Sequence, residues 1–261
     1  MLNDFDENQV WWAVIAPDQE PEKLSLNAAP VCVGPLLQEH LYDRFDGVVY
    51  TSATLTVGGS FDYYLKRVGL AALEERLALL RLPPVFDYER RSFFTMPAAF
   101  PSQDHPDFIG AFAEFAAALI QTVGGRIFFL FTSWQQLGSC HEAVLEKLPE
   151  GWRPLVLRQE AGGRSRELLL LDYRSTPGAV LFGVSSFWEG VDVKGESLIG
   201  VVIVKLPFQV PSDPVVQARQ EQLEAAGSSS FMEYSLPNAV IRFKQGIRSE
   251  EHTSELQSRQ S

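Results

Sequence analysis

The sequence predicts an α/β protein whose parallel sheet is covered by helices on both faces. Two observations lead to this fold class. Strand-like and helix-like segments alternate along most of the chain, and several of the strands are apolar at every position. A strand buried on both faces gives such a continuous apolar run, whereas a half-exposed antiparallel strand alternates apolar and polar residues. The alternation of the two segment types then favours helical crossovers between parallel strands.

The first elements follow from local patterns. A short apolar strand is expected at residues 47–50, just before Thr51. A helix is expected at 108–123, where phenylalanine, leucine and isoleucine recur at three- and four-residue spacing, with Asp107 assisting its start and Gly124-Gly125 ending it.

The later elements continue the alternation. Pro83, Pro84, Pro97, Pro101 and Pro106 make residues 76–107 a predicted connector, and Asp213-Pro214 is a typical helix start. In order, strands are expected at 126–131, 154–157, 179–184 and 198–204, and helices at about 133–148, 165–173, 213–226 and 237–244.

Composition excludes several classes of function. The net charge of −11 over 261 residues argues against coating duplex DNA by bulk electrostatics, although a local basic groove stays open. Cys32 and Cys140 lie far apart, so no disulfide framework, zinc site or iron–sulfur cluster is expected in this chain, and both thiols are expected to be free and buried. The acidic start and the polar residues in the longest apolar stretch predict a cytoplasmic globular chain without a membrane span.

The segment 181–193 is the strongest candidate for a ligand site. Its apolar strand leads into Phe187 and Trp188, and then into Glu189, Gly190 and Asp192. The carboxyl end of a parallel strand is where α/β proteins bind ligands. Glycine lets backbone approach a ligand, and Asp192 can accept hydrogen bonds from a sugar hydroxyl or a metal-bound water. The alternative is that the two aromatic rings belong to the core and the two acids to a solvated turn.

Four segments, taken in order, resemble one family. They are residues 51–55, 129–134 and 186–192, and the stretch from Lys205 through Glu233–Pro237 to Lys244–Ile247. Together they resemble motifs III, IV, V and VI of the second motor lobe of the DinG/XPD-type superfamily 2 DNA helicases, most closely the bacterial DinG-like branch. The resemblance covers about residues 24–247 and implies a RecA-like fold of the P-loop NTPase superfamily.

The resemblance also implies roles for individual residues. The nucleotide-binding residues would be Glu189, Gly190, Asp192 and Gln245, and the residues coupling nucleotide to DNA would be Thr51, Ser52 and Thr54. DNA would be bound by Thr132, Ser133, Trp134, Phe187 and Trp188, through phosphate contacts at a helix start and base stacking. The alternatives are that Trp134 and Trp188 are core residues and that Ser133 is only a helix cap. A phosphate track and a merely solvated face are both open for the arginines Arg90, Arg91, Arg153, Arg158, Arg164 and Arg166, and the solvated face is favoured for most of them. His40, His105 and His141 have no metal-ligand spacing, and no metal site is expected.

The sequence contains neither a phosphate-binding loop of the Gly-x-x-x-x-Gly-Lys type nor an Asp-Glu-Ala-His box. By resemblance, residues 1–58 would be the end of a first motor lobe, 59–107 a connector and 108–247 the second lobe. ATP and Mg²⁺ would be shared with a missing amino-terminal lobe, and any iron–sulfur cluster would lie there. Arg248 falls one position early for the family's arginine motif, and residues 248–261 read like a translated sequencing adapter or a disordered tail.

The predicted function is therefore the carboxyl-terminal motor lobe of an ATP-dependent 5′-3′ DNA helicase that moves on single-stranded DNA. A monomer is expected, inactive without the other lobe. The alternatives are a non-catalytic nucleic-acid-binding or interaction module that has kept one RecA-like lobe, and a helicase-like lobe fused to an exonuclease.

Overall fold

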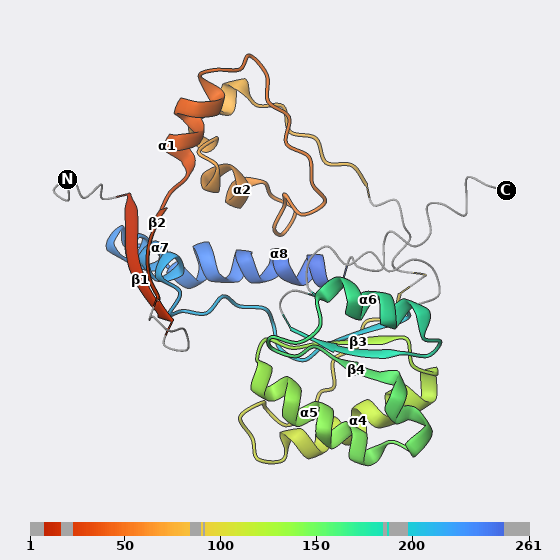
Figure 1. The fold of residues 1–261 in the computed structure, drawn as a ribbon. Coiled ribbons are helices and arrows are strands. Elements are labelled where there is room, and N and C mark those ends of the chain that lie inside the picture. The colour runs from red at the N-terminus through yellow and green to blue at the C-terminus, as the bar shows by residue number, and fades with distance from the viewer. Residues whose placement is uncertain are drawn as a thin grey trace. The chain divides into compact units, whose positions relative to one another are not determined.

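The computed structural model describes residues 8–16, 23–83, 90, 92–184, 187 and 198–247 (Figure 1). The chain divides into two compact units. Residues 1–80 and 208–241 form the first unit, and residues 81–207 and 242–261 form the second.

The second unit contains the predicted parallel sheet. Its strands are β3 (Ile127–Leu130), β4 (Val156–Arg158), β5 (Val180–Gly183) and β6 (Gly200–Ile203). They lie in the order β4-β5-β3-β6, and each neighbouring pair is parallel. The predicted fold class is confirmed, because the four strands that were expected to lie parallel in one sheet do so.

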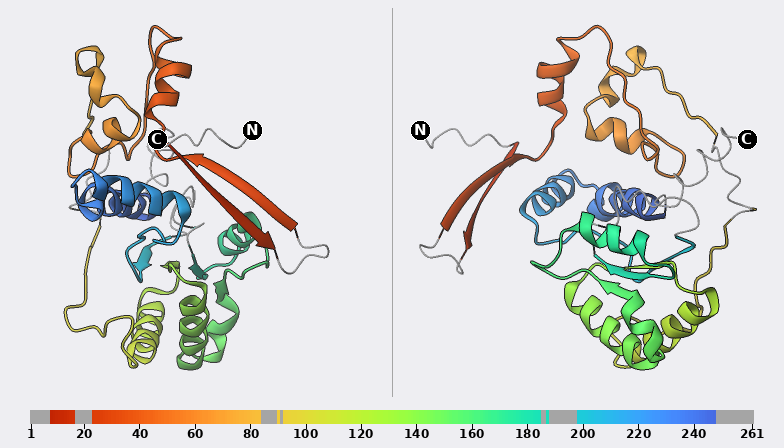
Figure 2. Two further views of the ribbon diagram at one scale, coloured as in Figure 1. Left: turned by 90° about the vertical axis from the view of Figure 1, so that its left-hand side faces the viewer. Right: turned by 45° about the vertical axis from the view of Figure 1, so that its right-hand side comes forward.

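Helices cover both faces of this sheet, as Figures 1 and 2 show. One face carries α4 (Phe108–Val123) and α5 (Trp134–Lys147), and the opposite face carries α6 (Arg166–Ser175). The strand residues contribute to two buried clusters, one beneath α4 and α5 and one beneath α6. Phenylalanine rings pack against one another in the first cluster, where the ring of Phe129 stacks on that of Phe182 with centroids 4.7 Å apart.

The ends of the helices follow the chemistry of their flanking residues. The end of α4 is Gly124, which has the left-handed φ of 78° that glycine adopts without strain. Ser133 begins α5 and Ser165 begins α6, each with a hydroxyl that accepts a backbone N–H hydrogen bond. Asp107 is the N-cap residue of α4, but its carboxylate makes no such capping hydrogen bond.

The first unit holds an antiparallel hairpin and short helices. The hairpin pairs β1 (Gln9–Ala16) with β2 (Lys23–Pro30). Arg219 on α7 (Pro214–Ala225) donates to the carbonyl of Val31 at 2.8 Å, and this bond ties the helix to the end of the hairpin. The helical segments are α1 (Gly34–Leu37), the π-helical turn η1 (Gln38–Tyr42), α2 (Asp62–Arg67), the 3₁₀ segment η2 (Ala71–Arg76), α7 (Pro214–Ala225), the π-helical turn η6 (Phe231–Ser235) and α8 (Leu236–Ile247), whose last residues belong to the second unit.

Two sequence predictions of strands need correction. Residues 47–50 form no strand, and Val49 is 89% exposed. An apolar run becomes a strand only where another strand pairs with it, and residues 47–50 pair with no described strand. The strand expected at 154–157 begins at Val156, because Pro154 lies inside the preceding 3₁₀ segment η3 (Glu150–Leu155).

The two thiols differ in accessibility, which corrects the expectation that both are buried. Cys140 is fully buried in α5, and burial raises the pKa of its thiol to about 12, whereas Cys32 is half-buried. We expect a thiol reagent at pH 8 to modify Cys32 first, and Cys140 at least about 100-fold more slowly, because only the accessible thiolate reacts. Time-resolved Ellman titration measures both rates. Rapid modification of Cys140 in a Cys32→Ser variant would show that the core of the second unit opens readily.

Candidate functional site

The carboxyl edge of the parallel sheet is the candidate site in the second unit. In the sheet register Leu130 at the end of β3 pairs with Gly183 of β5 and with Ile203 of β6, so these strands end at one level. The ladder continues for one residue, since Phe131 N–H donates to the Gly183 carbonyl at 2.8 Å and Val204 N–H donates to the Leu130 carbonyl at 3.0 Å. The residues that follow the strands therefore gather at this edge.

The start of α5 presents polar groups at this edge. Thr132 and Ser133 are exposed, and Ser133 is extended with φ −134° and ψ 131°. Its hydroxyl oxygen accepts the N–H of Gln136 at 3.4 Å, so the predicted helix cap is confirmed. The helix dipole and the free N–H groups of this first turn favour an anion such as phosphate.

Trp134 stands beside these hydroxyls and is 44% exposed. The interpretation of Trp134 as a core residue is therefore wrong. The buried face of α5 is formed by Leu137, Cys140, His141 and Val144, further along the helix. Trp134 is the first residue of α5, just after the end of β3.

Lys205 is a residue of this edge that the sequence prediction of individual sites missed. It follows β6 and Val204 and is exposed. Because β6 neighbours β3, this positive charge and the hydroxyls of Thr132 and Ser133 follow adjacent strands. The signal in the sequence was its position directly after an apolar strand.

Phe187 does not have the exposed ring that base stacking requires. It is 0% exposed, and its ring meets that of Phe128 edge-on at 6.4 Å. A methyl group added at Gly183 would lie 2.8 Å from the Phe187 ring, so the ring packs directly on the end of β5. The prediction that Phe187 stacks on a base is wrong, and the core interpretation holds for this residue. Trp188, Glu189, Gly190 and Asp192 lie outside the described residues.

The remaining predicted residues lie on other segments. Thr51 and Ser52 are exposed in the first unit, where Thr54 N–H donates to the Ser52 hydroxyl at 3.2 Å. Gln245 lies on the part of α8 that belongs to the second unit, and its Oε1 is buried without a hydrogen-bond partner among the described residues. The second unit thus carries Thr132, Ser133 and Trp134 on consecutive positions at the start of α5, whereas Thr51, Ser52 and Thr54 belong to the first unit.

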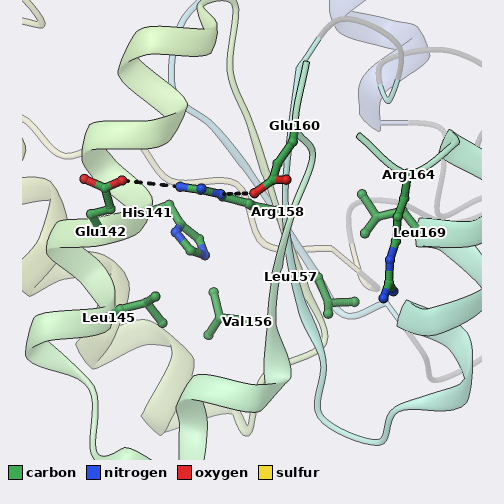
Figure 3. A pocket seen from close by; sticks show the side chains of 9 residues that line it. All are labelled: His141, Glu142, Leu145, Val156, Leu157, Arg158, Glu160, Arg164 and Leu169. Carbon is green, nitrogen blue, oxygen red and sulfur yellow. Dashed lines mark hydrogen bonds and ion pairs between the residues drawn. The ribbon is translucent and has the colours of Figure 1, made fainter. Parts of the chain in front are cut away.

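A pocket of about 510 Å³ lies beside β4 (Figure 3). This strand and β6 are the two edge strands of the sheet. Arg158 spans its rim, donating to Glu160 at 2.9 Å and to Glu142 at 3.4 Å. Arg164 pairs with Asp172, so both arginines are held by carboxylates, as the solvated-face alternative anticipated. The sequence did not predict this pocket, because its walls come from α5, β4 and α6.

No group of three or more histidine, cysteine, aspartate and glutamate side chains among the described residues has an arrangement suited to a metal ion. Among the described helices, none combines the length and the apolar character that a membrane crossing requires.

Comparison with known proteins finds one family. Residues 116–252 match the family model of the helicase C-terminal domain. The chain is 33% identical to the "3'-5' exonuclease DinG" of Bacillus subtilis over 245 residues, which is 93% of this chain and 26% of that protein. It is 34% identical over 228 residues to the ATP-dependent DNA helicase YoaA of Escherichia coli, covering 85% of this chain and 34% of that protein. It is 32% identical over 243 residues to the ATP-dependent helicase DinG of Mycobacterium tuberculosis, covering 92% and 35%. The chain thus spans about a quarter to a third of the length of these relatives.

Proposed function

Because this chain belongs to the family of helicase C-terminal domains, in the form found in DinG-like helicases, we propose that it is the second motor lobe of an ATP-dependent DNA helicase. The lobe would move 5′ to 3′ along single-stranded DNA and would need a first lobe to hydrolyse ATP. The observation that supports this proposal best is the carboxyl edge of the sheet, where Thr132, Ser133 and exposed Trp134 lie within the region that matches the family.

The proposed DNA contact uses two kinds of interaction. A backbone phosphate would bind the N–H groups at the start of α5 together with the hydroxyls of Thr132 and Ser133. Lys205 would add a positive charge from the neighbouring strand. The exposed face of Trp134 would stack on a base, an interaction that tolerates any base and so suits a motor that moves along every sequence.

The proposed nucleotide contact rests on the end of α8. The Gln245 side chain fits a site for ATP and Mg²⁺, since its carboxamide oxygen is buried and lacks a hydrogen-bond partner among the described residues. The amide nitrogen would donate to a phosphate oxygen, and the amide oxygen would accept a proton of the attacking water and so orient it. Mg²⁺ in this role neutralises phosphate charge. Glu189, Gly190 and Asp192 would face the same nucleotide, with Asp192 contacting the ribose or a metal-bound water.

Thr51, Ser52 and Thr54 would couple the two ligands. The hydroxyls of Ser52 and Thr54 already share a hydrogen bond at 3.2 Å. Such a network can release one partner and bond another as two motor lobes close and open. In this proposal the hydroxyls switch between nucleotide-linked and DNA-linked partners during each cycle.

Replacing Trp134 tests the proposed DNA contact. We expect Trp134→Ala to weaken binding of a fluorescein-labelled oligothymidylate about 5- to 150-fold, since base stacking on an aromatic side chain contributes about 1–3 kcal/mol. Fluorescence anisotropy at fixed ionic strength measures the dissociation constants. Trp134→Phe should keep most of the affinity.

Trp11→Ala is the matched control, because Trp11 is another exposed tryptophan, on β1 of the first unit. Its removal should leave the dissociation constant unchanged. Equal affinities for Trp134→Ala and the unaltered chain would remove Trp134 from the DNA site.

A further inference from the structure

The outer edge of β4 carries backbone groups that no described strand pairs with. Within the described sheet, β4 has β5 as its single neighbour, and Gln159 N–H donates to the Phe182 carbonyl at 2.9 Å. The backbone groups of successive strand residues point to opposite sides of the strand, so the N–H and the carbonyl of Arg158 point away from β5. Neither group bonds to another described residue. This edge can therefore extend the ladder by a further strand.

Apolar side chains flank this edge on both faces of the sheet. Val156 belongs to the buried cluster beneath α4 and α5, whereas Leu157 packs against the cluster beneath α6. The pocket beside β4 is lined from both faces, and Figure 3 shows its side chains on the two sides of the strand. Leu145 on α5 and Leu157 are only partly buried, so each face keeps apolar surface that a bound segment would cover.

An extended polypeptide segment matches both features. Its backbone can exchange hydrogen bonds with Arg158, and its side chains alternate between two faces, as those of β4 do. One side chain then lies toward Leu145 and the next toward Leu157. A compact ligand on one face of the sheet would leave the other face uncovered.

The charges beside the edge narrow the chemistry of the segment. A charged side chain on an edge strand usually opposes pairing. The guanidinium of Arg158 is instead drawn toward Glu142 on α5 and toward Glu160, at 3.4 and 2.9 Å (Figure 3). Arg164, the other arginine of the lining, pairs with Asp172. Both arginines of the lining thus already have carboxylate partners, and an uncharged segment complements this edge better than a charged one.

The size of the edge decides between a flexible segment and a second folded copy of the chain. β4 has three residues, whereas a stable dimer of folded proteins buries about 800 Å² on each partner. A flexible segment needs only the edge and the apolar surface on its two faces.

We propose that the outer edge of β4 binds an extended, uncharged and mainly apolar segment of a partner protein, which adds a strand to the sheet. The segment exchanges backbone hydrogen bonds with Arg158 and packs alternate side chains on Leu145 and Leu157. This interaction goes beyond the proposed motor function. It does not use the start of α5, so either proposal can fail without the other.

Nuclear magnetic resonance of the ¹⁵N-labelled unaltered chain tests the proposal. The probe is a short capped peptide of alternating valine and isoleucine between serines, N-methylated at every second residue, which leaves donors on one edge and stops the peptide pairing with itself. The control peptide has the same side chains but is N-methylated at every residue of the apolar core. We expect the probe to shift the backbone amide signal of Arg158 saturably and the control to leave it in place. The signal of Gln136, at the start of α5, should not move with either peptide.

Three results would overturn the proposal. The first is an Arg158 signal that the probe does not move up to millimolar concentration. The second is an equal shift with both peptides, which would mean that side chains bind an apolar patch without adding a strand. The third is a dimer of the unaltered chain in sedimentation that Arg158→Pro dissociates, which would place a second copy at this edge.

A pair of substitutions at Arg158 isolates its backbone N–H. Arg158→Pro removes this donor, and an edge strand accepts proline where the N–H faces away from the sheet. Arg158→Ala is the matched control, because it loses the same ion pairs but keeps the N–H. We expect calorimetry to show the probe binding about tenfold more weakly to Arg158→Pro than to Arg158→Ala. Equal affinities of the two variants would contradict strand addition, and if Arg158→Pro melts early, the two peptides on the unaltered chain decide.

Discussion

Gly125→Ala is expected to prevent stable folding of the second unit. Gly125 has φ 78°, and a Cβ atom there would lie 2.0 Å from the carbonyl oxygen of Gly178. The atoms that the methyl group would meet are all backbone atoms of Gly178, so they cannot turn away as a side chain would. The contact sits where the chain enters β3, next to the bond from Arg126 N–H to the Ala179 carbonyl at 2.8 Å. Separation of the two segments would break the β3–β5 pairing.

The expected cost is at least about 4 kcal/mol of the free energy of unfolding, which is a large share of the total for a domain. Urea denaturation followed by circular dichroism measures it. Gly138→Ala is the matched control, because Gly138 lies inside α5 with open space around its missing side chain. This control should stabilise the unit by up to about 1 kcal/mol. A Gly125→Ala chain with the midpoint of the unaltered chain would show that the described approach of the two backbones is wrong.

Phe182→Ala is expected to destabilise the second unit by about 3–5 kcal/mol, because it removes a large ring from a core that cannot fully collapse. Phe182 lies on β5, between β4 and β3, and is fully buried. Its ring stacks on Phe129 at 4.7 Å and on Phe131 at 5.7 Å, and it meets His141 edge-on at 5.4 Å.

Thermal and urea unfolding of the Phe182→Ala chain measure this loss. Phe93→Ala provides the control, since Phe93 is 90% exposed and its removal should change the free energy of unfolding by no more than about 0.5 kcal/mol. Equal effects of the two substitutions would mean that the ring cluster does not hold the sheet together.

Local patterns predicted the second unit well. The apolar runs that became β3, β5 and β6 are buried by the unit itself, and α4 matches its predicted bounds of 108 and 123. The run at 47–50 is also largely apolar, but it finds no strand partner among the described residues and forms no strand. Strand composition alone therefore cannot decide pairing. The β1–β2 hairpin was missed for a related reason, because its register depends on the pairing of two segments and not on either one alone.

The candidate site was predicted only in part. Spacing placed Thr132 and Ser133 at the start of a helix, and the cap is confirmed. Whether an aromatic ring is exposed depends on the elements packed around it in the folded chain. Trp134 is therefore exposed, contrary to the core interpretation, and Phe187 is buried, contrary to the base-stacking prediction. The pocket beside β4 has no motif in the sequence, because its lining comes from three elements that meet only in the folded chain.

The measurement that tests the central proposal most directly is ATP hydrolysis by the purified chain, with and without single-stranded DNA. The proposal assigns this chain the residues that close on a nucleotide, and it assigns the phosphate-binding loop to another lobe. We therefore predict that the folded chain, in the presence of Mg²⁺, releases phosphate no faster than buffer does, although it binds the oligothymidylate. DNA-stimulated release of phosphate by this chain alone would contradict the proposed division of labour between two lobes.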